Sequence, residues 1–134
     1  MASRNTRQNA YDAAAIVIGL DSLTGLQTAR VLAARHVPVV GLAKNTSHYC
    51  CRTRACKRPV QVDTDSDDLI CYLERTGPQL SKKAVLFPCT DLSVLRISEH
   101  RDRLARWYHI ALADHEIVQR LLNKARFVEF AQKH

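Results

Sequence analysis

Residues 13–25, AAAIVIGLDSLTG, decide the fold of this chain. An uninterrupted apolar run ends at Gly19, a short polar turn follows, and a helical spacing of apolar residues begins at Leu23. This order is typical of a buried parallel strand that leads into a helix whose first N–H groups face a crevice. Because backbone donors in such a crevice favour negative charge, we expect a small molecule with phosphate or carboxylate groups to bind here.

Four further short apolar runs follow, at residues 37–43, 59–62, 84–89 and 108–113. Runs of this length without alternation are typical of strands that are covered on both faces. Since helical patterns separate the runs, they predict right-handed βαβ units. The expected fold is therefore α/β: a three-layer, Rossmann-like arrangement with a parallel sheet of about five strands in the order 3-2-1-4-5 and helices on both faces.

Residues typical of helix starts and helix ends bound several of the helical patterns between the runs. Acidic residues open the pattern at 66–76, and Gly77-Pro78 is expected to end it through a left-handed glycine cap. Asp114 is expected to cap a helix over residues 116–122. The remaining patterns start at Leu23, cover residues 91–106 with a break near His100, and cover residues 124–134.

The length of 134 residues suits one domain, which we expect over residues 13–134 behind a disordered tail at 1–12. No apolar run approaches the ~20 residues needed to span a bilayer, and the tail lacks the apolar centre of a signal peptide. We therefore expect a cytoplasmic protein with no membrane partner and with reduced cysteines. Cys71 and Cys89 lie in apolar patterns and are expected to act as small core residues.

A cysteine cluster, Cys50, Cys51 and Cys56, follows His48 and looks like part of a metal site. Zinc sites usually combine two separated ligand pairs, and adjacent cysteines rarely bind one ion together. Since no second half of such a pattern follows, we expect a reduced loop near the sheet edge and no metal.

The net charge of +7 raises the question of nucleic acid. Most charges look scattered, and aromatic residues do not alternate with the densest basic group, so we do not expect nucleic acid to be the main ligand. The basic group would either form a rim for an acidic substrate or a solvated surface. It comprises Arg52, Arg54, Lys57 and Arg58.

The expected strand order places the turn after the first strand opposite the turn after the fourth. Ser22 and Thr24 would add hydroxyl donors, and Asp21 would orient a cation or an amine. A tight turn without a ligand, and plain helix capping at the second turn, remain the alternatives. The glycine spacing does not match the dinucleotide fingerprint, and Lys44 stands where an acidic ribose ligand would be expected. The candidate substrate-binding residues are Gly19, Asp21, Ser22, Thr24, Gly25, Thr90 and Asp91.

Four stretches together resemble the N-terminal, pre-ATP-grasp domain of ATP-grasp ligases, in particular carboxylate–amine ligases and D-aspartate ligases. They are AIVIGLDSLTGLQTARVLAARHVPVVGLA, HYCCRTRACKR, AVLFPCTDLSVLRISEHRDRL and LLNKARFVEFAQKH. The resemblance implies an enzyme that joins a carboxylate to an amine through an acyl-phosphate made with ATP and Mg²⁺. It implies that Lys124 reaches the nucleotide phosphates and that the two turns line the substrate pocket.

In this family the lobes that grip ATP and the acidic residues that hold Mg²⁺ lie further toward the C-terminus. The resemblance therefore implies a fragment of a longer chain that is inactive alone and binds no cofactor tightly. We also expect an apolar patch that includes Phe127 or Phe130 and makes the isolated domain a homodimer. The alternative is a stand-alone Rossmann-like module that binds a nucleotide or another small ligand; a nucleic-acid-binding protein is the third hypothesis.

Overall fold

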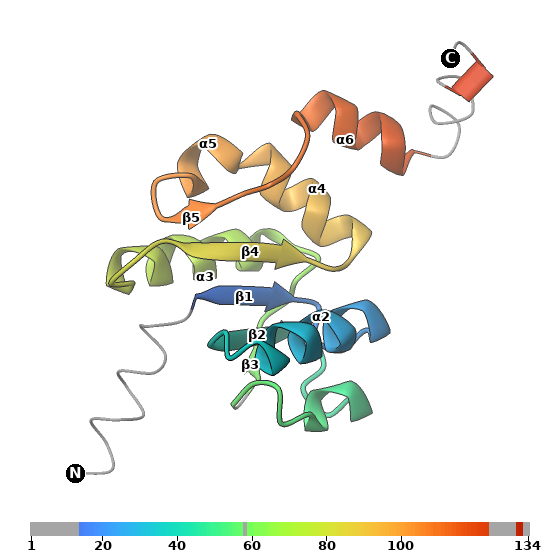
Figure 1. The fold of residues 1–134 in the computed structure, drawn as a ribbon. Coiled ribbons are helices and arrows are strands. Elements are labelled where there is room, and N and C mark those ends of the chain that lie inside the picture. Colours follow the sequence, from blue (N-terminus) through green and yellow to red (C-terminus); the bar gives the residue numbers. More distant parts are fainter. Residues whose placement is uncertain (1–13, 58, 124–130, 133–134) are drawn as a thin grey trace.

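A computed structural model describes residues 14–57, 59–123 and 131–132. Five strands form one parallel sheet in the order β3-β2-β1-β4-β5, with helices between them (Figure 1). This confirms the α/β fold and the strand order expected from the sequence. The strands are β1 Ala15–Ile18, β2 Val39–Ala43, β3 Val60–Gln61, β4 Ala84–Pro88 and β5 Tyr108–His109. The helices are α2 Leu23–Ala34, α3 Asp67–Thr76, α4 Asp91–Glu99, α5 Arg101–Leu104 and α6 His115–Leu122, with 3-10 turns η1 Tyr49–Arg52 and η2 Gly77–Gln79.

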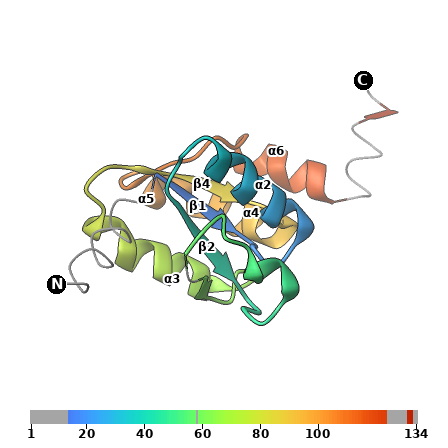
Figure 2. The same ribbon diagram turned by 60° about the horizontal axis from the view of Figure 1, so that its bottom comes forward.

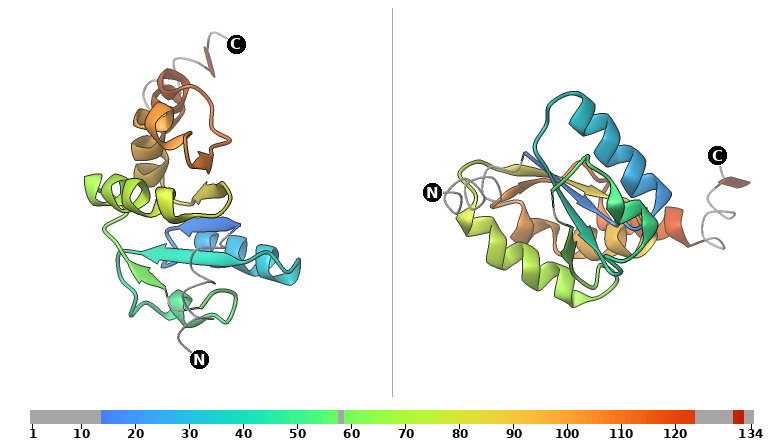
Figure 3. Two further views of the ribbon diagram at one scale, coloured as in Figure 1. Left: turned by 90° about the vertical axis from the view of Figure 1, so that its left-hand side faces the viewer. Right: turned by 90° about the horizontal axis from the view of Figure 1, so that it is seen from below.

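Helices cover both faces of the sheet, as the unbroken apolar strands require. Figures 2 and 3 show α2 on one face and α3 and α4 on the other. All four residues of β1 are buried, because this strand is central and touches both layers. The core on the α3 and α4 face includes Ile16 and Leu69. The smaller core under α2 includes Val17 and Ala29.

The sheet register aligns the carboxyl ends of β1 and β4. Ala15 pairs with Val39 of β2 on one side and with Val85 of β4 on the other. The chain then leaves β1 toward α2 and leaves β4 toward α4, which lie on opposite faces. This edge is the topological switch point, where ligands of such sheets bind.

The outer strands are shorter than the apolar runs predicted. β5 comprises only Tyr108–His109, although the apolar run continues to residue 113. A strand at the edge has a partner on one side only, so apolar residues beyond that pairing can pack without joining the ladder. Ile110 and Leu112 do so, since both lie against the main core while outside the strand.

Two local expectations about α3 were wrong. Gly77 has φ −51° and ψ −51°, so it is right-handed and starts η2 instead of forming a left-handed cap. Its lack of a side chain serves packing, because a Cβ would lie 2.6 Å from Cγ of Trp107. Cys71 is exposed and not a core residue, because its neighbours Leu69, Ile70 and Leu73 fill the buried face of α3.

The remaining helix predictions are largely confirmed. The break near His100 separates α4 from α5, and α6 begins directly after Asp114. The Asp114 side chain makes no capping bond there; it pairs with Arg101 at 3.4 Å instead. Within the part of the chain that the structure describes, no helix is both long and apolar enough to cross a membrane. The tail at 1–12 and the pattern at 124–134, apart from residues 131–132, lie outside the described residues.

Candidate functional site

The turn after β1 is held by its own backbone and by one hydroxyl. Gly19 has φ +95°, a conformation that favours glycine, and its N–H donates to the Leu42 carbonyl at 2.9 Å. The Ser22 hydroxyl donates to the Gly19 carbonyl at 2.6 Å and accepts from the Gly25 N–H at 3.0 Å. Ser22 is therefore the N-cap of α2, and its one hydroxyl proton is already donated to the Gly19 carbonyl.

Gly25 is needed for the close approach of α2 to the strand. A Cβ at this position would lie 2.7 Å from the Gly19 carbonyl carbon and 3.0 Å from Cα of Leu20. Both are backbone atoms, which cannot move aside. The sequence placed Gly25 in a ligand turn; in the structure it allows the helix to start directly against the end of β1.

The turn after β4 carries a complete capping box. The Thr90 hydroxyl accepts from the Ser93 N–H at 3.3 Å, and the Ser93 hydroxyl accepts from the Thr90 N–H at 3.2 Å. Thr90 is thus the N-cap of α4, and Asp91 is its first residue. An acidic side chain at this position also matches the positive end of the helix dipole.

The two turns meet. A Cβ built on Gly19 would lie 2.9 Å from Cγ2 of Thr90 and 3.8 Å from Cβ of Cys89. The Cys89 N–H also donates to the Ile18 carbonyl at 2.9 Å, which ties the end of β4 to the end of β1. Segments about 70 residues apart in sequence therefore form one edge, which we call the switch-point site. It comprises the seven candidate residues Gly19, Asp21, Ser22, Thr24, Gly25, Thr90 and Asp91.

Asp21 binds the neighbouring loop through a hydrogen bond. Its carboxylate accepts a hydrogen bond from the Asn45 N–H at 3.0 Å, which links the turn after β1 to the chain after β2. Burial raises the pKa of the nearby Cys51 thiol, and the negative charge of Asp21 adds to this effect. Asp21 thus has a structural use that the sequence did not reveal.

The groups that still face outward at the switch-point site are few. Thr24 and Asp91 have exposed side chains. The first N–H groups of α2, at Leu23 and Thr24, belong to the turn in which a helix has no acceptor of its own. The site therefore offers backbone donors and a hydroxyl from α2, and a carboxylate from the first turn of α4.

Lys44 belongs to a separate ion-pair cluster. Its ammonium lies 3.4 Å from the Asp65 carboxylate and 3.7 Å from that of Asp63. These partners raise the pKa of Lys44, and the hydrogen bond that its ammonium donates to the Asp65 carboxylate has the largest effect. The pKa of Asp63 is lowered, chiefly by a hydrogen bond from the Asp65 backbone. The cluster joins the chain after β2 to the chain after β3.

The cysteine cluster belongs to the core beneath η1. Cys50, Cys51 and Cys56 are buried free thiols, and the last two pack against the residues under α2. Burial raises the pKa of Cys56 as well as that of Cys51. Across the described residues, no group of three His, Cys, Asp or Glu side chains could hold a metal ion.

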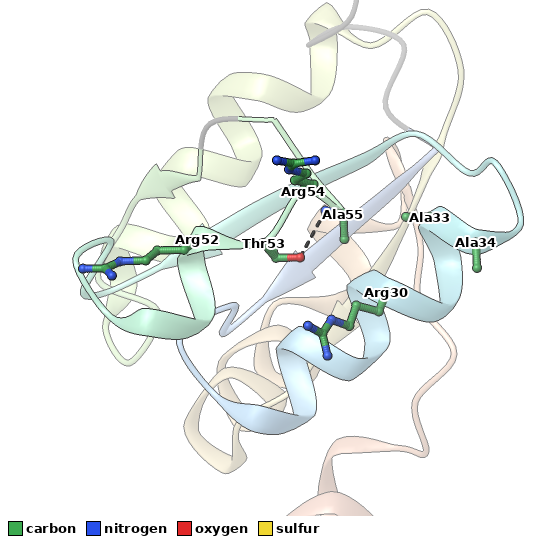
Figure 4. Close-up of a pocket in the computed structure, with 7 residues that line it drawn as sticks. All are labelled: Arg30, Ala33, Ala34, Arg52, Thr53, Arg54 and Ala55. Atoms are coloured by element: carbon green, nitrogen blue, oxygen red, sulfur yellow. Dashed lines mark hydrogen bonds between the residues drawn. The ribbon is translucent and has the colours of Figure 1, made fainter.

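An open hollow of about 590 Å³, lined by none of the switch-point residues, lies between α2 and the chain at the end of η1 and just after it (Figure 4). The fold adds Arg30 of α2 to the basic group that the sequence analysis singled out. Sequence spacing alone did not pair Arg30 with a loop more than 20 residues away. The lining residues are Arg30, Ala33, Ala34, Arg52, Thr53, Arg54 and Ala55.

Comparisons of the chain with protein-family models, curated proteins and solved structures find no match. The function is therefore argued from the residues of this chain. Lys124, Phe127 and Phe130, to which the resemblance and the patch expectation assigned roles, lie outside the described residues. Their roles stay predictions.

Proposed function

We propose that this chain is the substrate-binding N-terminal domain of an ATP-dependent carboxylate–amine ligase of the ATP-grasp class. The observation that supports it most directly is the contact between Gly19 and Thr90 at the switch point of a 3-2-1-4-5 sheet. This contact joins the two turns that resemble the substrate loops of that class. Folds of this kind host many functions, so it is the site and not the fold that supports this function.

The site fits a small zwitterion or an amino dicarboxylate. The N-terminus of α2 supplies N–H donors and a positive dipole end for a carboxylate. The exposed carboxylate of Asp91, on the adjoining turn, is the group we assign to an amine. Asp21 was expected to take this role, but one of its oxygens already holds the Asn45 N–H.

ATP and Mg²⁺ belong, in this proposal, to the ATP-grasp lobes of the parent enzyme. Phosphoryl transfer needs metal and phosphate clamps, and the described residues do not themselves form a metal site. The role proposed for this domain is to hold a substrate, and no catalysis is assigned to it alone.

Calorimetric titration with L-aspartate, D-aspartate, L-glutamate, ATP, ADP and NAD tests the proposal. We expect saturable binding of at least one amino acid. Asp91→Asn should weaken that binding about tenfold or more, because a hydrogen bond to a charged group contributes about 1.5–3 kcal/mol. Asp68→Asn is the matched control, since Asp68 is an exposed acidic residue in the first turn of α3 and should leave binding unchanged.

Two results would contradict the proposal. One is equal affinity in the Asp91→Asn and Asp68→Asn variants, which would remove Asp91 from the site. The other is specific ATP binding with no response to any amino acid, which would favour the stand-alone nucleotide module.

A further inference from the structure

The positive charge of this chain is concentrated in one segment. No acidic residue occurs between Asp21 and Asp63. Seven of the 20 Lys and Arg residues fall in that interval, which leaves 13 to balance the 13 acidic residues elsewhere. The whole excess of +7 therefore comes from this interval, so the expectation of scattered charge is wrong. The seven are Arg30, Arg35, Lys44, Arg52, Arg54, Lys57 and Arg58.

The fold gathers this segment on one flank. It builds α2, β2, η1 and the loop after η1, and the last two lie beside α2. Among the ion pairs formed by described residues, Lys44 is the only member of the segment that takes part. Arg30, Arg52 and Arg54 are exposed and have no acidic partner within that part of the chain. Their positive field is therefore not cancelled locally.

These three arginines are among the residues that line the hollow. Figure 4 shows the Arg30 side chain at α2, whereas the Arg52 and Arg54 side chains extend from η1 and from the loop in different directions, away from Arg30. The Thr53 hydroxyl accepts from the Ala55 N–H at 3.1 Å and so fixes the turn between Arg52, at the end of η1, and Arg54 in the loop. Guanidinium groups spread along a surface suit a chain of phosphates better than one enclosed anion.

An exposed aromatic ring accompanies the arginines. Tyr49 is 64% exposed, and it lies three residues before Arg52 in η1. Because a 3-10 helix has three residues per turn, these two side chains share one side of η1. The Tyr49 ring also lies against His48, with centroids 4.4 Å apart, and the His48 Nδ1 accepts from the Cys50 N–H.

We propose that the basic flank, formed by Arg30, Arg52 and Arg54 with Tyr49, binds single-stranded nucleic acid. The arginines contact successive phosphates, and the Tyr49 ring stacks on a base. Single strands are favoured over a duplex because a stacking platform needs an unpaired, accessible base. None of these four residues belongs to the switch-point site, so variants at the two sites test the two proposals separately.

Fluorescence anisotropy with labelled oligo-dT and oligo-rU of about 12 nucleotides tests this proposal at several salt concentrations. We expect affinity to fall steeply with salt. The double variant Arg52→Gln/Arg54→Gln should weaken binding about tenfold or more and reduce the salt slope by about 1.4, the value for two phosphate contacts on a single strand. Tyr49→Ala should weaken binding about fivefold or more, and Tyr49→Phe should restore it.

The matched control is Lys82→Gln/Arg106→Gln, which removes the same charge from two exposed residues elsewhere. It should change affinity less than about twofold, since screening weakens distant charges. Circular dichroism of each variant checks that the fold is kept. Equal losses in the two double variants, unchanged binding in Tyr49→Ala, or equal affinity for duplex DNA would each overturn the proposal. So would binding to phosphatidylserine vesicles, or to pyrophosphate, without binding to either oligonucleotide.

Discussion

Gly25 is the residue on which the start of α2 depends most. A side chain here would press on the carbonyl group of Gly19 and on Cα of Leu20, which are backbone atoms of the preceding turn. Alanine is normally preferred to glycine inside a helix by about 1 kcal/mol. At this position the contact with fixed backbone outweighs that preference, so the glycine is retained for space.

We predict that Gly25→Ala lowers the free energy of unfolding by about 3 kcal/mol, at the upper end of the range for overpacked sites. Urea unfolding followed by circular dichroism measures the change. Gln27→Ala, an exposed position two residues further along α2, is the control and should stay within about 0.5 kcal/mol of the parent. A Gly25→Ala protein as stable as the parent would mean that α2 can move away from β1.

At the level of single residues, the sequence indicated positions better than roles. Gly19, Ser22 and Thr90 were predicted at the ends of β1 and β4, and they lie there. Their detailed use was not predictable, because the hydrogen bonds of Ser22 depend on the φ of Gly19, and the contact of Thr90 depends on strand pairing. The position of Arg30 beside the loop after η1 was not predicted either, because it depends on how α2 packs against that loop. The absence of acidic residues between Asp21 and Asp63 did indicate that positive charge is concentrated in this segment.

The end of α2 shows an element whose sequence is not optimal. The His36 N–H donates to the Ala33 carbonyl and the Val37 N–H donates to the Leu32 carbonyl, which is the Schellman arrangement. His36 therefore adopts φ +60°, a left-handed conformation that costs a residue with a Cβ about 1–2 kcal/mol. Glycine is the usual residue at this position.

We predict that His36→Gly raises the free energy of unfolding by about 1 kcal/mol, since the left-handed backbone is then unstrained. His36→Ala serves as the control and should give no gain, because alanine keeps the Cβ. Thermal unfolding of both variants in one buffer compares them. A larger gain from alanine than from glycine would contradict the conformational explanation.

At the level of elements, the sequence predicted the central strands well and the edges poorly. β1 is apolar on both faces and buried throughout, and β4 has the same apolar pattern, with Ala84 and Leu86 buried. The ends of β3 and β5 depend on having a neighbour on one side only, which no local pattern records. Gly77 was misjudged because its partner, Trp107, comes from a distant turn.

The molecule as a whole contains buried groups that resist ionisation. Burial raises the pKa of Tyr108 well above its usual range, and its hydroxyl donates to the Leu73 carbonyl at 2.7 Å. Burial likewise raises the pKa of Tyr72 and of Cys89. The unfolded chain loses these protons first, so stability is complete at neutral pH and falls as the pH rises above the ordinary pKa values.

We predict that Tyr108→Phe costs about 1–2 kcal/mol at pH 8, because the Leu73 carbonyl loses its donor. This difference should shrink by about 0.8 kcal/mol at pH 10.5. Only the parent protein has the Tyr108 hydroxyl, and ionisation of that hydroxyl in the unfolded chain lowers the free energy of unfolding. Urea unfolding of both proteins from pH 8 to 10.5 gives the two curves. A constant gap across this range would show that Tyr108 ionises as easily when folded as when unfolded.

The most direct test of the account is to map amino acid binding on the backbone amides. In a two-dimensional ¹H–¹⁵N spectrum titrated with the amino acid that binds, the account predicts saturable shifts at Leu23, Thr24 and Asp91, the groups that the two turns bring together. Shifts confined to the α2–η1 hollow, or at one turn without the other, would contradict the claim that both turns form one substrate site.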